Sequence, residues 1–98
     1  MTVSAGELWL ADRGDETRRV VFIISDARFH RLAERALIAP VLDAAPATPR
    51  PWHIILGGRA IAANLLGTIP VDQLLERVDR AGFDTLRAVR RAVREITN

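Results

Sequence analysis

The stretch from Gly6 to Ser25, GELWLADRGDETRRVVFIIS, decides the fold of this chain. Glu7–Ala11 has the composition of a strand, and Val20–Ile24 is apolar at every position, which is typical of a strand buried on both faces. The connection 12–19 between them carries three arginines and three acidic residues. A charged connection that enters a buried strand is held in a defined place, and small folds commonly present polar chemistry in this way.

Weaker signals continue the pattern toward the C-terminus. Ser25 or Asp26 is positioned to cap a short helical turn. Ala36–Leu42 is a third apolar run, and its Pro40 cannot donate to a strand ladder, which predicts an edge, a bulge or a strand end. The segment 43–51 contains three prolines and indicates an exposed loop.

A hairpin is the next predicted feature. Trp52–Leu56 is a fourth strand candidate, and the Gly57-Gly58 turn joins it to the apolar run 60–66. The segment 67–70 interrupts the strand pattern with a glycine and a proline. The segment 71–78 is compatible with a short helix or with another strand.

The last predicted element is an amphipathic helix. Asp84 can cap it. Apolar residues recur at helical spacing on one face, namely Leu86, Val89, Val93 and Ile96. The other face carries Arg87, Arg90, Arg91 and Arg94. We therefore expect one α+β domain over residues 1–98: a small, strongly twisted, mostly antiparallel sheet of about four to six strands, forming an SH3-like barrel or half-barrel, with a C-terminal α-helix.

Composition restricts the class of protein. A chain of 98 residues supports one modest core. It contains no cysteine, which excludes disulfides and thiolate metal sites and is compatible with a reducing cytoplasm. No apolar run approaches the roughly 20 residues that span a bilayer, and the first six residues do not resemble a signal peptide. We expect a soluble cytoplasmic protein with no membrane partner.

The charge is more informative in kind than in amount. A net charge of +2 gives no global field that would attract nucleic acid. All 14 basic residues are arginine, however. Genomic base composition can explain this bias, and so can a need for planar, bidentate contacts with phosphate or carboxylate groups.

Three features of the sequence together resemble the MazF/PemK toxins. Gly-Glu-Leu-Trp at 6–9, a loop containing Glu16 and the run Arg19–Ser25 are similar to G-[DE]-[IV]-[WY], a Gly/Glu-bearing loop and R-P-V-V-V-V-S. Ile38–Val41 is similar to the third strand of that family, which often has V-V-P-L. The amphipathic C-terminal helix also occupies the position of theirs.

This resemblance implies a fold of the CcdB/MazF type and the toxin of a type II toxin–antitoxin pair. Such toxins are cytoplasmic homodimers that cleave single-stranded RNA without a metal or cofactor. A short acidic segment of a cognate antitoxin neutralises them. In the reaction a ribose 2′-OH attacks the adjacent phosphate, which needs a proton acceptor, a proton donor and a cation on the developing charge.

The resemblance also implies a set of site residues. Arg19 matches the functional arginine, and Glu16 is similar to the loop glutamate. On this basis our hypothesis is that Glu16 or His53 handles protons and that Arg13, Arg18 and Thr68 bind the RNA. Thr68 is what remains of the family's D-Q-x-R-T segment, which falls on 64–68.

Departures from the family pattern leave two other functions open. Leu42 stands where the family has a threonine, Asn64 where it has an aspartate, and Ala62 where some members have an arginine. Residues 68–71 and the following helix also resemble CcdB, a non-enzymatic toxin that poisons DNA gyrase, although its terminal Trp-Gly-Ile is absent here. A CcdB-like gyrase poison, or a degenerate toxin that only binds its antitoxin, are therefore the alternatives.

The singled-out residues have structural interpretations as well. Arg19 could simply pair with a loop acid, and His53 fits a partly buried structural histidine. Trp9 and Trp52 could stack on bases or anchor the core. The arginines of the C-terminal helix could form a solvated face or a docking surface for an acidic antitoxin segment. The two histidines show no metal-ligand spacing, so no metal site is expected.

Overall fold

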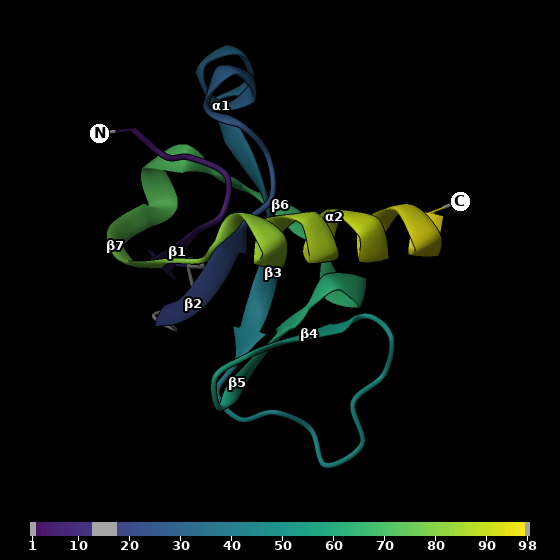
Figure 1. Cartoon of the computed structure of the whole chain (residues 1–98). Helices are drawn as coiled ribbons and strands as arrows, with labels where there is room; N and C mark the ends of the chain where they lie inside the picture. The colour runs from purple at the N-terminus through teal and green to yellow at the C-terminus, as the bar shows by residue number, and fades with distance from the viewer. Residues whose placement is uncertain (1, 13–17, 98) are drawn as a thin grey trace.

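The computed structural model describes residues 2–12 and 18–97. Within these ranges the chain forms seven strands, two α-helices and two 3-10 turns (Figure 1). In chain order they are β1 (Glu7–Asp12), β2 (Arg18–Ile23), α1 (Ala27–Ala33), β3 (Arg35–Leu42), β4 (His53–Leu56), β5 (Arg59–Ala62), η1 (Ala63–Leu65), β6 (Gly67–Pro70), η2 (Val71–Gln73), β7 (Leu74–Arg80) and α2 (Phe83–Thr97).

The strands form one antiparallel sheet that is not closed into a barrel. The strand order is β4-β5-β3-β2-β1-β7, and β6 pairs with β3 outside this path. β3 has two partners on one side because its first half pairs with β6 and its last two residues pair with β5. The α+β class and the twisted, half-barrel arrangement with a C-terminal helix are therefore confirmed.

Both faces of β2 are buried near its C-terminal end, as its apolar run predicts. Val21 and Ile23 belong to a cluster with Trp9, Ile38 and Ile69 on one face of the sheet. Phe22 belongs to a second cluster on the other face, which α2 covers with Leu86, Val89 and Val93. Figure 1 shows α2 lying across this face of the sheet. β2 is thus the strand on which the two cores meet.

Pro40 lies within β3, between the two segments that β3 uses for different partners. It is opposite Val21 of β2. On the other side of β3, Arg35–Ile38 pair with β6, and pairing with β5 begins at Val41. Among the described strands, no residue on that side is paired with Pro40. The missing N–H of proline is therefore tolerated at an interruption of the ladder.

The chain from 52 to 80 confirms part of the expectation and corrects part. The Gly57-Gly58 hairpin joins β4 to β5 as predicted. The second strand, however, ends at Ala62, and 63–65 is a 3-10 turn. The interpretation of 67–70 as a break is wrong: β6 has its glycine and proline at its two ends, and Ile69 between them packs into the core. The ambiguous segment 71–78 divides into η2 and β7.

The helices agree with the sequence except in two details. Asp26 caps α1 as predicted, and its side chain accepts a hydrogen bond from the amide of Phe29 at 2.9 Å. Asp84 lies inside the first turn of α2 and does not precede it. Arg90 does not belong to the solvated face, because its guanidinium donates to the carbonyl oxygen of Ile24 at 2.8 and 3.3 Å. None of the helices in the described residues is long and apolar enough to cross a membrane.

Candidate functional site

An open groove of about 370 Å³ follows β3 and the edge strand β6, and its lining includes Val21, Ile38 and Ile69 from the face of the sheet away from α2. β2, β3, the β6 strand and the turns beside it supply its lining. The polar side chains among the lining residues are Arg19, Arg35, Thr68 and Gln73, and the apolar ones include Val21, Ile38 and Pro40. None of these lining residues carries a carboxylate or an imidazole, so the groove is basic.

Arg19 reaches the groove because of its position in β2. Side chains alternate along a strand, so Arg19 shares the face of Val21, and both line the groove. The register of β2 with β3, continued two residues beyond the Val21–Pro40 pair, brings Arg19 opposite Leu42. Arg19 is exposed, and in the described part of the chain it has no hydrogen-bond or ion-pair partner. Among the described residues, therefore, no carboxylate pairs with the guanidinium of Arg19 at the groove.

Thr68 lines the same groove from β6. Its hydroxyl oxygen accepts a hydrogen bond from Arg35 Nε at 3.1 Å, and its carbonyl oxygen accepts one from Arg35 Nη2 at 3.1 Å. Sequence reasoning did not select Arg35, because its contact with Thr68 depends on the pairing of β3 with β6. The structure thus brings Arg19 and Thr68 to one groove and adds a second arginine to it.

The other predicted RNA-binding and catalytic residues of the β1–β2 region lie elsewhere. Arg18 is exposed and lies opposite Asp12 in the β1–β2 ladder. It directly precedes Arg19 in β2, and consecutive side chains of a strand point to opposite faces. It therefore projects from the other face of β2 and does not line the groove. Arg13 and Glu16 lie outside the described residues.

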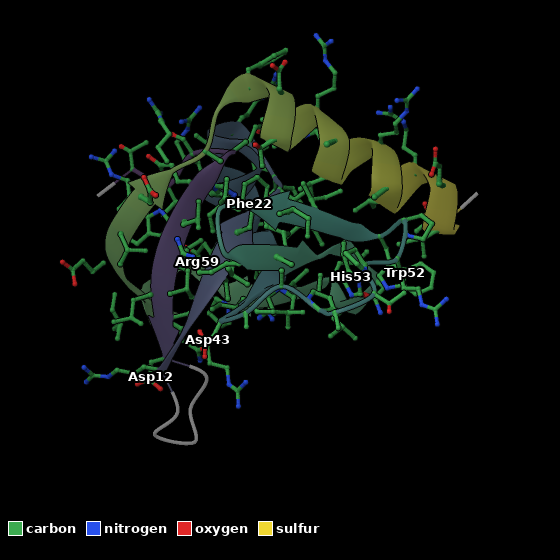
Figure 2. The ribbon with its side chains drawn as sticks, turned by 60° about the horizontal axis from the view of Figure 1, so that its bottom comes forward. Asp12, Phe22, Asp43, Trp52, His53 and Arg59 are labelled. Carbon is green, nitrogen blue, oxygen red and sulfur yellow. The ribbon has the colours of Figure 1, made fainter. Side chains whose placement is uncertain are left out.

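His53 does not line the groove either. It begins β4 and is half-buried, and its Nδ1 accepts a hydrogen bond from the amide of Arg50 at 2.9 Å. The ring of Trp52 packs against it edge-on, with centroids 6.1 Å apart. Figure 2 shows this pair on the opposite side of the molecule from Asp12, where β1 ends. These contacts match the structural interpretation of His53.

The positions that depart from the family pattern also divide between two places. Leu42 is half-buried at the end of β3, opposite Ala60 of β5. Asn64 is exposed in η1 and lines a hollow that Trp52 and Ile96 also border, beside α2 and outside the groove. Asn64 is therefore not available to act on a ligand held beside Thr68.

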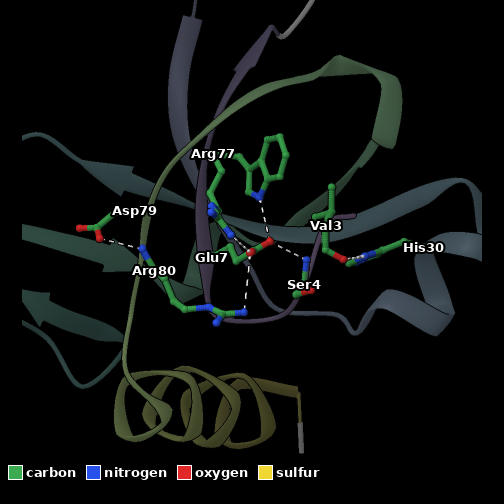
Figure 3. Close-up of polar contacts among 8 residues, drawn as sticks. Val3, Ser4, Glu7, His30, Arg77, Asp79 and Arg80 are labelled. Atoms are coloured by element: carbon green, nitrogen blue, oxygen red, sulfur yellow. Dashed lines mark hydrogen bonds and ion pairs between the residues drawn. The ribbon is translucent and has the colours of Figure 1, made fainter. Parts of the chain in front are cut away.

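Sequence reasoning did not find the buried network around Glu7. Glu7 is only 1% exposed. Its Oε1 accepts hydrogen bonds from the Ser4 amide at 2.7 Å and from Trp9 Nε1 at 3.2 Å, and its Oε2 accepts one from Arg77 Nη1 at 3.0 Å (Figure 3). Burial by itself raises the pKa of Glu7, but these hydrogen bonds outweigh it, and the pKa is lowered. This carboxylate is ionised and fully occupied, so it is a structural group.

His30, given little weight from the sequence, is a buried structural residue. Its Nδ1 lies 2.9 Å from the carbonyl oxygen of Val3, which can only accept, so we assign the proton to Nδ1. In this tautomer Nε2 accepts from the hydroxyl of Ser25, at 2.6 Å. Ser25 also accepts from the amide of Leu37 at 2.8 Å. The network ties the N-terminal segment to α1 and β3.

Residues 4–97 match the family model described as the PemK-like, MazF-like toxin of type II toxin–antitoxin systems. No curated protein matches the chain. In the part of the chain that is described, no group of three or more acidic or histidine side chains could hold a metal ion.

Solved structures of such toxins share the fold. The chain is similar to a MazE–MazF structure (Form-II) from Deinococcus radiodurans, with a TM-score of 0.85, 19% identity and coverage of 99% of this chain and 96% of that chain. It is similar to an endoribonuclease in complex with its cognate antitoxin from Mycobacterial species, with a TM-score of 0.83, 14% identity and coverage of 97% and 94%. It is also similar to the Mycobacterium tuberculosis toxin MazF-mt6, with a TM-score of 0.75, 13% identity and coverage of 93% of this chain and 95% of that chain.

Proposed function

The chain belongs to the PemK-like, MazF-like toxin family of type II toxin–antitoxin systems, and from that premise we propose that it is a metal-independent endoribonuclease. It cleaves single-stranded RNA in the cytoplasm, arrests growth, and acts as a homodimer. A cognate antitoxin neutralises it. The similarity to an endoribonuclease bound to its antitoxin supports this proposal.

The observation that carries the proposal is the guanidinium of Arg19, which has no ion-pair partner among the described residues and lines a groove that Thr68 also lines. Cleavage forms a bond between the ribose O2′ and phosphorus and breaks the bond from phosphorus to O5′. Negative charge builds up on the phosphate oxygens in between. A fixed cation in a basic groove stabilises that charge, and removing such a group typically costs about 10²–10³ in rate.

Proton transfer needs a different residue, because arginine stays protonated and cannot act as a base. The described lining of the groove holds no carboxylate or imidazole. Glu16 is three residues from Arg19 in the sequence, and we propose it as the group that takes the proton of the 2′-OH. His53 is the second candidate for this proton acceptor. The leaving O5′ takes up a proton from the protonated acceptor or from water, so the number of protons is conserved.

Cleavage of RNA by the purified protein tests the proposal. Single-stranded RNA is incubated with the protein in the presence and absence of EDTA, and the new ends are analysed. We expect chelator-resistant fragments with 2′,3′-cyclic phosphate and 5′-hydroxyl ends. Arg19→Ala should reduce the rate about 10²–10³-fold. Arg18→Ala is the matched control, because it removes the same charge from the other face of β2 and should have a much smaller effect.

A catalytically degenerate toxin is the second candidate, and Leu42 is the observation that favours it. A leucine at the groove end of β3 cannot donate the hydrogen bond that a threonine provides there. Intact RNA in both arms of the experiment, together with stable binding of an antitoxin, would support this candidate. Intact RNA with relaxed plasmid accumulating in cells would instead support a gyrase poison.

We propose the exposed arginines of α2 as the docking surface for the acidic segment of the antitoxin. Arg87, Arg91 and Arg94 border a hollow that Pro51 and Ile54 also line, and these three arginines outnumber its two carboxylates, Asp84 and Glu95. Arg90 is not part of this surface, because it is bonded to Ile24. Arg91→Glu should therefore weaken antitoxin binding, measured by calorimetry, while leaving RNA cleavage intact.

A further inference from the structure

The guanidinium of Arg35 is held at two points on β6, and this fixes its direction. Nε donates to the hydroxyl oxygen of Thr68 and Nη2 to the carbonyl oxygen of Thr68, both at 3.1 Å. Arg35 is opposite Pro70 in the β3–β6 register, so Thr68 is its diagonal neighbour two residues along β6. A long side chain reaches such a neighbour. Arg35 therefore lies across β6.

The ladder explains why the carbonyl of Thr68 is free to accept. The amide of Val71 donates to the carbonyl of Glu34, one register step before the Arg35–Pro70 pair. Hydrogen-bonded and non-hydrogen-bonded pairs alternate in an antiparallel ladder. Counting from the hydrogen-bonded Glu34–Val71 pair, the Leu37–Thr68 pair is non-hydrogen-bonded. The carbonyl of Thr68 then points away from β3. Arg35 thus extends its guanidinium to the outer edge of β6, where it borders the groove.

Three of the five N–H donors of Arg35 remain available after the two bonds to Thr68. The side chain is exposed. Among residues 2–12 and 18–97, the ion pairs are those of Arg77 and Arg80 with Glu7, and Arg35 takes part in neither. A guanidinium that is held in place, has spare donors and has no ion-pair partner among the described residues suits a phosphate group, which accepts bidentate contacts.

Arg35 and Arg19 lie toward opposite ends of β3. Arg35 begins β3, and the register brings Arg19 opposite Leu42, seven residues further along the same strand. At about 3.3 Å per residue, their backbones are separated by roughly 23 Å along β3. We propose that Arg35, oriented by Thr68, binds a phosphate of the RNA several nucleotides from the scissile bond. This inference rests on the proposed function and makes Arg35 a positioning residue.

Binding of RNA that cannot be cleaved tests the role of Arg35 separately from cleavage. The probes are a 2′-O-methylated single strand of about ten nucleotides and a 2′-O-methylated dinucleotide, both measured by fluorescence anisotropy over a range of salt concentrations. We expect Arg35→Ala to weaken binding of the long strand about 5–10-fold and to leave the dinucleotide unaffected. The slope of log K against log salt should decrease by about 0.7, the value for one phosphate contact on a single strand.

Arg28→Ala is the matched control, because it removes an exposed arginine of α1 that does not line the groove. On a long cleavable RNA, Arg35→Ala should raise KM with kcat nearly unchanged, whereas Arg19→Ala should lower kcat. If Arg35→Ala does not fold, Arg35→Gln removes the charge, retains an amide that can bond to Thr68, and should give the same losses.

The outcomes separate the two proposals. If the wild-type protein binds and cleaves RNA and Arg35→Ala behaves like Arg28→Ala, the role of Arg35 is wrong and the proposed function stands. If the wild-type protein neither binds nor cleaves RNA, both fail. If Arg35→Ala weakens the dinucleotide as much as the long strand, Arg35 acts at the scissile phosphate and the remote contact is wrong.

Discussion

Arg77 Nη1 donates a hydrogen bond to Glu7 Oε2 at 3.0 Å, and this pair connects the edge strand β7 to β1 across 70 residues of sequence. The carboxylate is inside and the guanidinium is mostly exposed, with side-chain exposures of 2% and 57%. β7 is otherwise exposed along almost its whole length, and its register with β1 shifts twice. Among the described residues, the buried carboxylate therefore provides the side-chain ion pairs that add to the backbone pairing of β7 with β1.

We expect Glu7→Gln to destabilise the fold by about 1–3 kcal/mol, because one acceptor oxygen becomes an NH2 donor that faces N–H groups in either orientation of the amide: Arg77 in one, Ser4 and Trp9 in the other. Urea unfolding at pH 7 measures the change. Glu76→Gln removes an exposed carboxylate from the same strand β7 and is the control, with an expected change near zero. Equal effects of the two substitutions would contradict this account of Glu7.

The same variant should change the response to acid. The pKa of Glu7 lies below its usual value of 4.5, because the hydrogen bonds it accepts outweigh the effect of burial. A carboxyl whose folded-state pKa is lowered stabilises the fold above its unfolded-state pKa, and this stabilisation disappears as the pH falls through the folded-state pKa. The stability difference between wild type and Glu7→Gln should therefore be complete at neutral pH and should shrink below about pH 4.5. A difference that stays constant into strong acid would refute the assignment.

Glu34 offers a stabilising substitution at the end of α1. Its φ of 57° and ψ of 21° are left-handed, and among the described residues it is the only non-glycine with positive φ. A Cβ makes this conformation unfavourable, whereas glycine adopts it freely. Glu34→Gly should raise the unfolding free energy by about 0.5–1 kcal/mol, measured by thermal melting. Glu34→Ala keeps the Cβ and should give no comparable gain.

The identity of the general base can be decided between Glu16 and His53. We expect Glu16→Gln to lower kcat about 10²-fold or more, because a positioned base contributes that much. His53→Gln should lower kcat less than about 3-fold, since His53 is bonded to Arg50 and lies outside the groove lining. A large loss in His53→Gln, together with a shift of the acidic limb of the pH–rate profile, would instead make His53 the base.

The success of the sequence-based predictions depended on whether a signal is local. The hairpin at Gly57-Gly58 and the Asp26 cap follow from turn and capping chemistry over a few residues, and both are present. The strand Gly67–Pro70 was missed because local propensity counts glycine and proline against a strand. Pairing with β3 and burial of Ile69 outweigh that propensity.

The candidate site was predicted only in part, for a related reason. Arg19 was found because it directly precedes a buried strand, and Thr68 was found through the family resemblance. Arg35 was missed because nothing in the sequence around residue 35 indicates a partner 33 residues away. The hydrogen bond from Arg90 to the carbonyl oxygen of Ile24 was not predicted, because helical spacing alone assigns Arg90 to the polar face of the helix.

The sequence by itself determined that strands lie near 7–11 and 20–24, where the structure has 7–12 and 18–23, together with the hairpin and the amphipathic C-terminal helix, because periodicity and turn chemistry act over a few neighbouring residues. Only the tertiary structure decided which face of β2 borders the groove, and therefore that Arg19 lines it and Arg18 does not. It alone also brought Arg35 to Thr68. These relationships depend on the register between distant strands, and register is set by how both faces of the sheet bury their apolar side chains together.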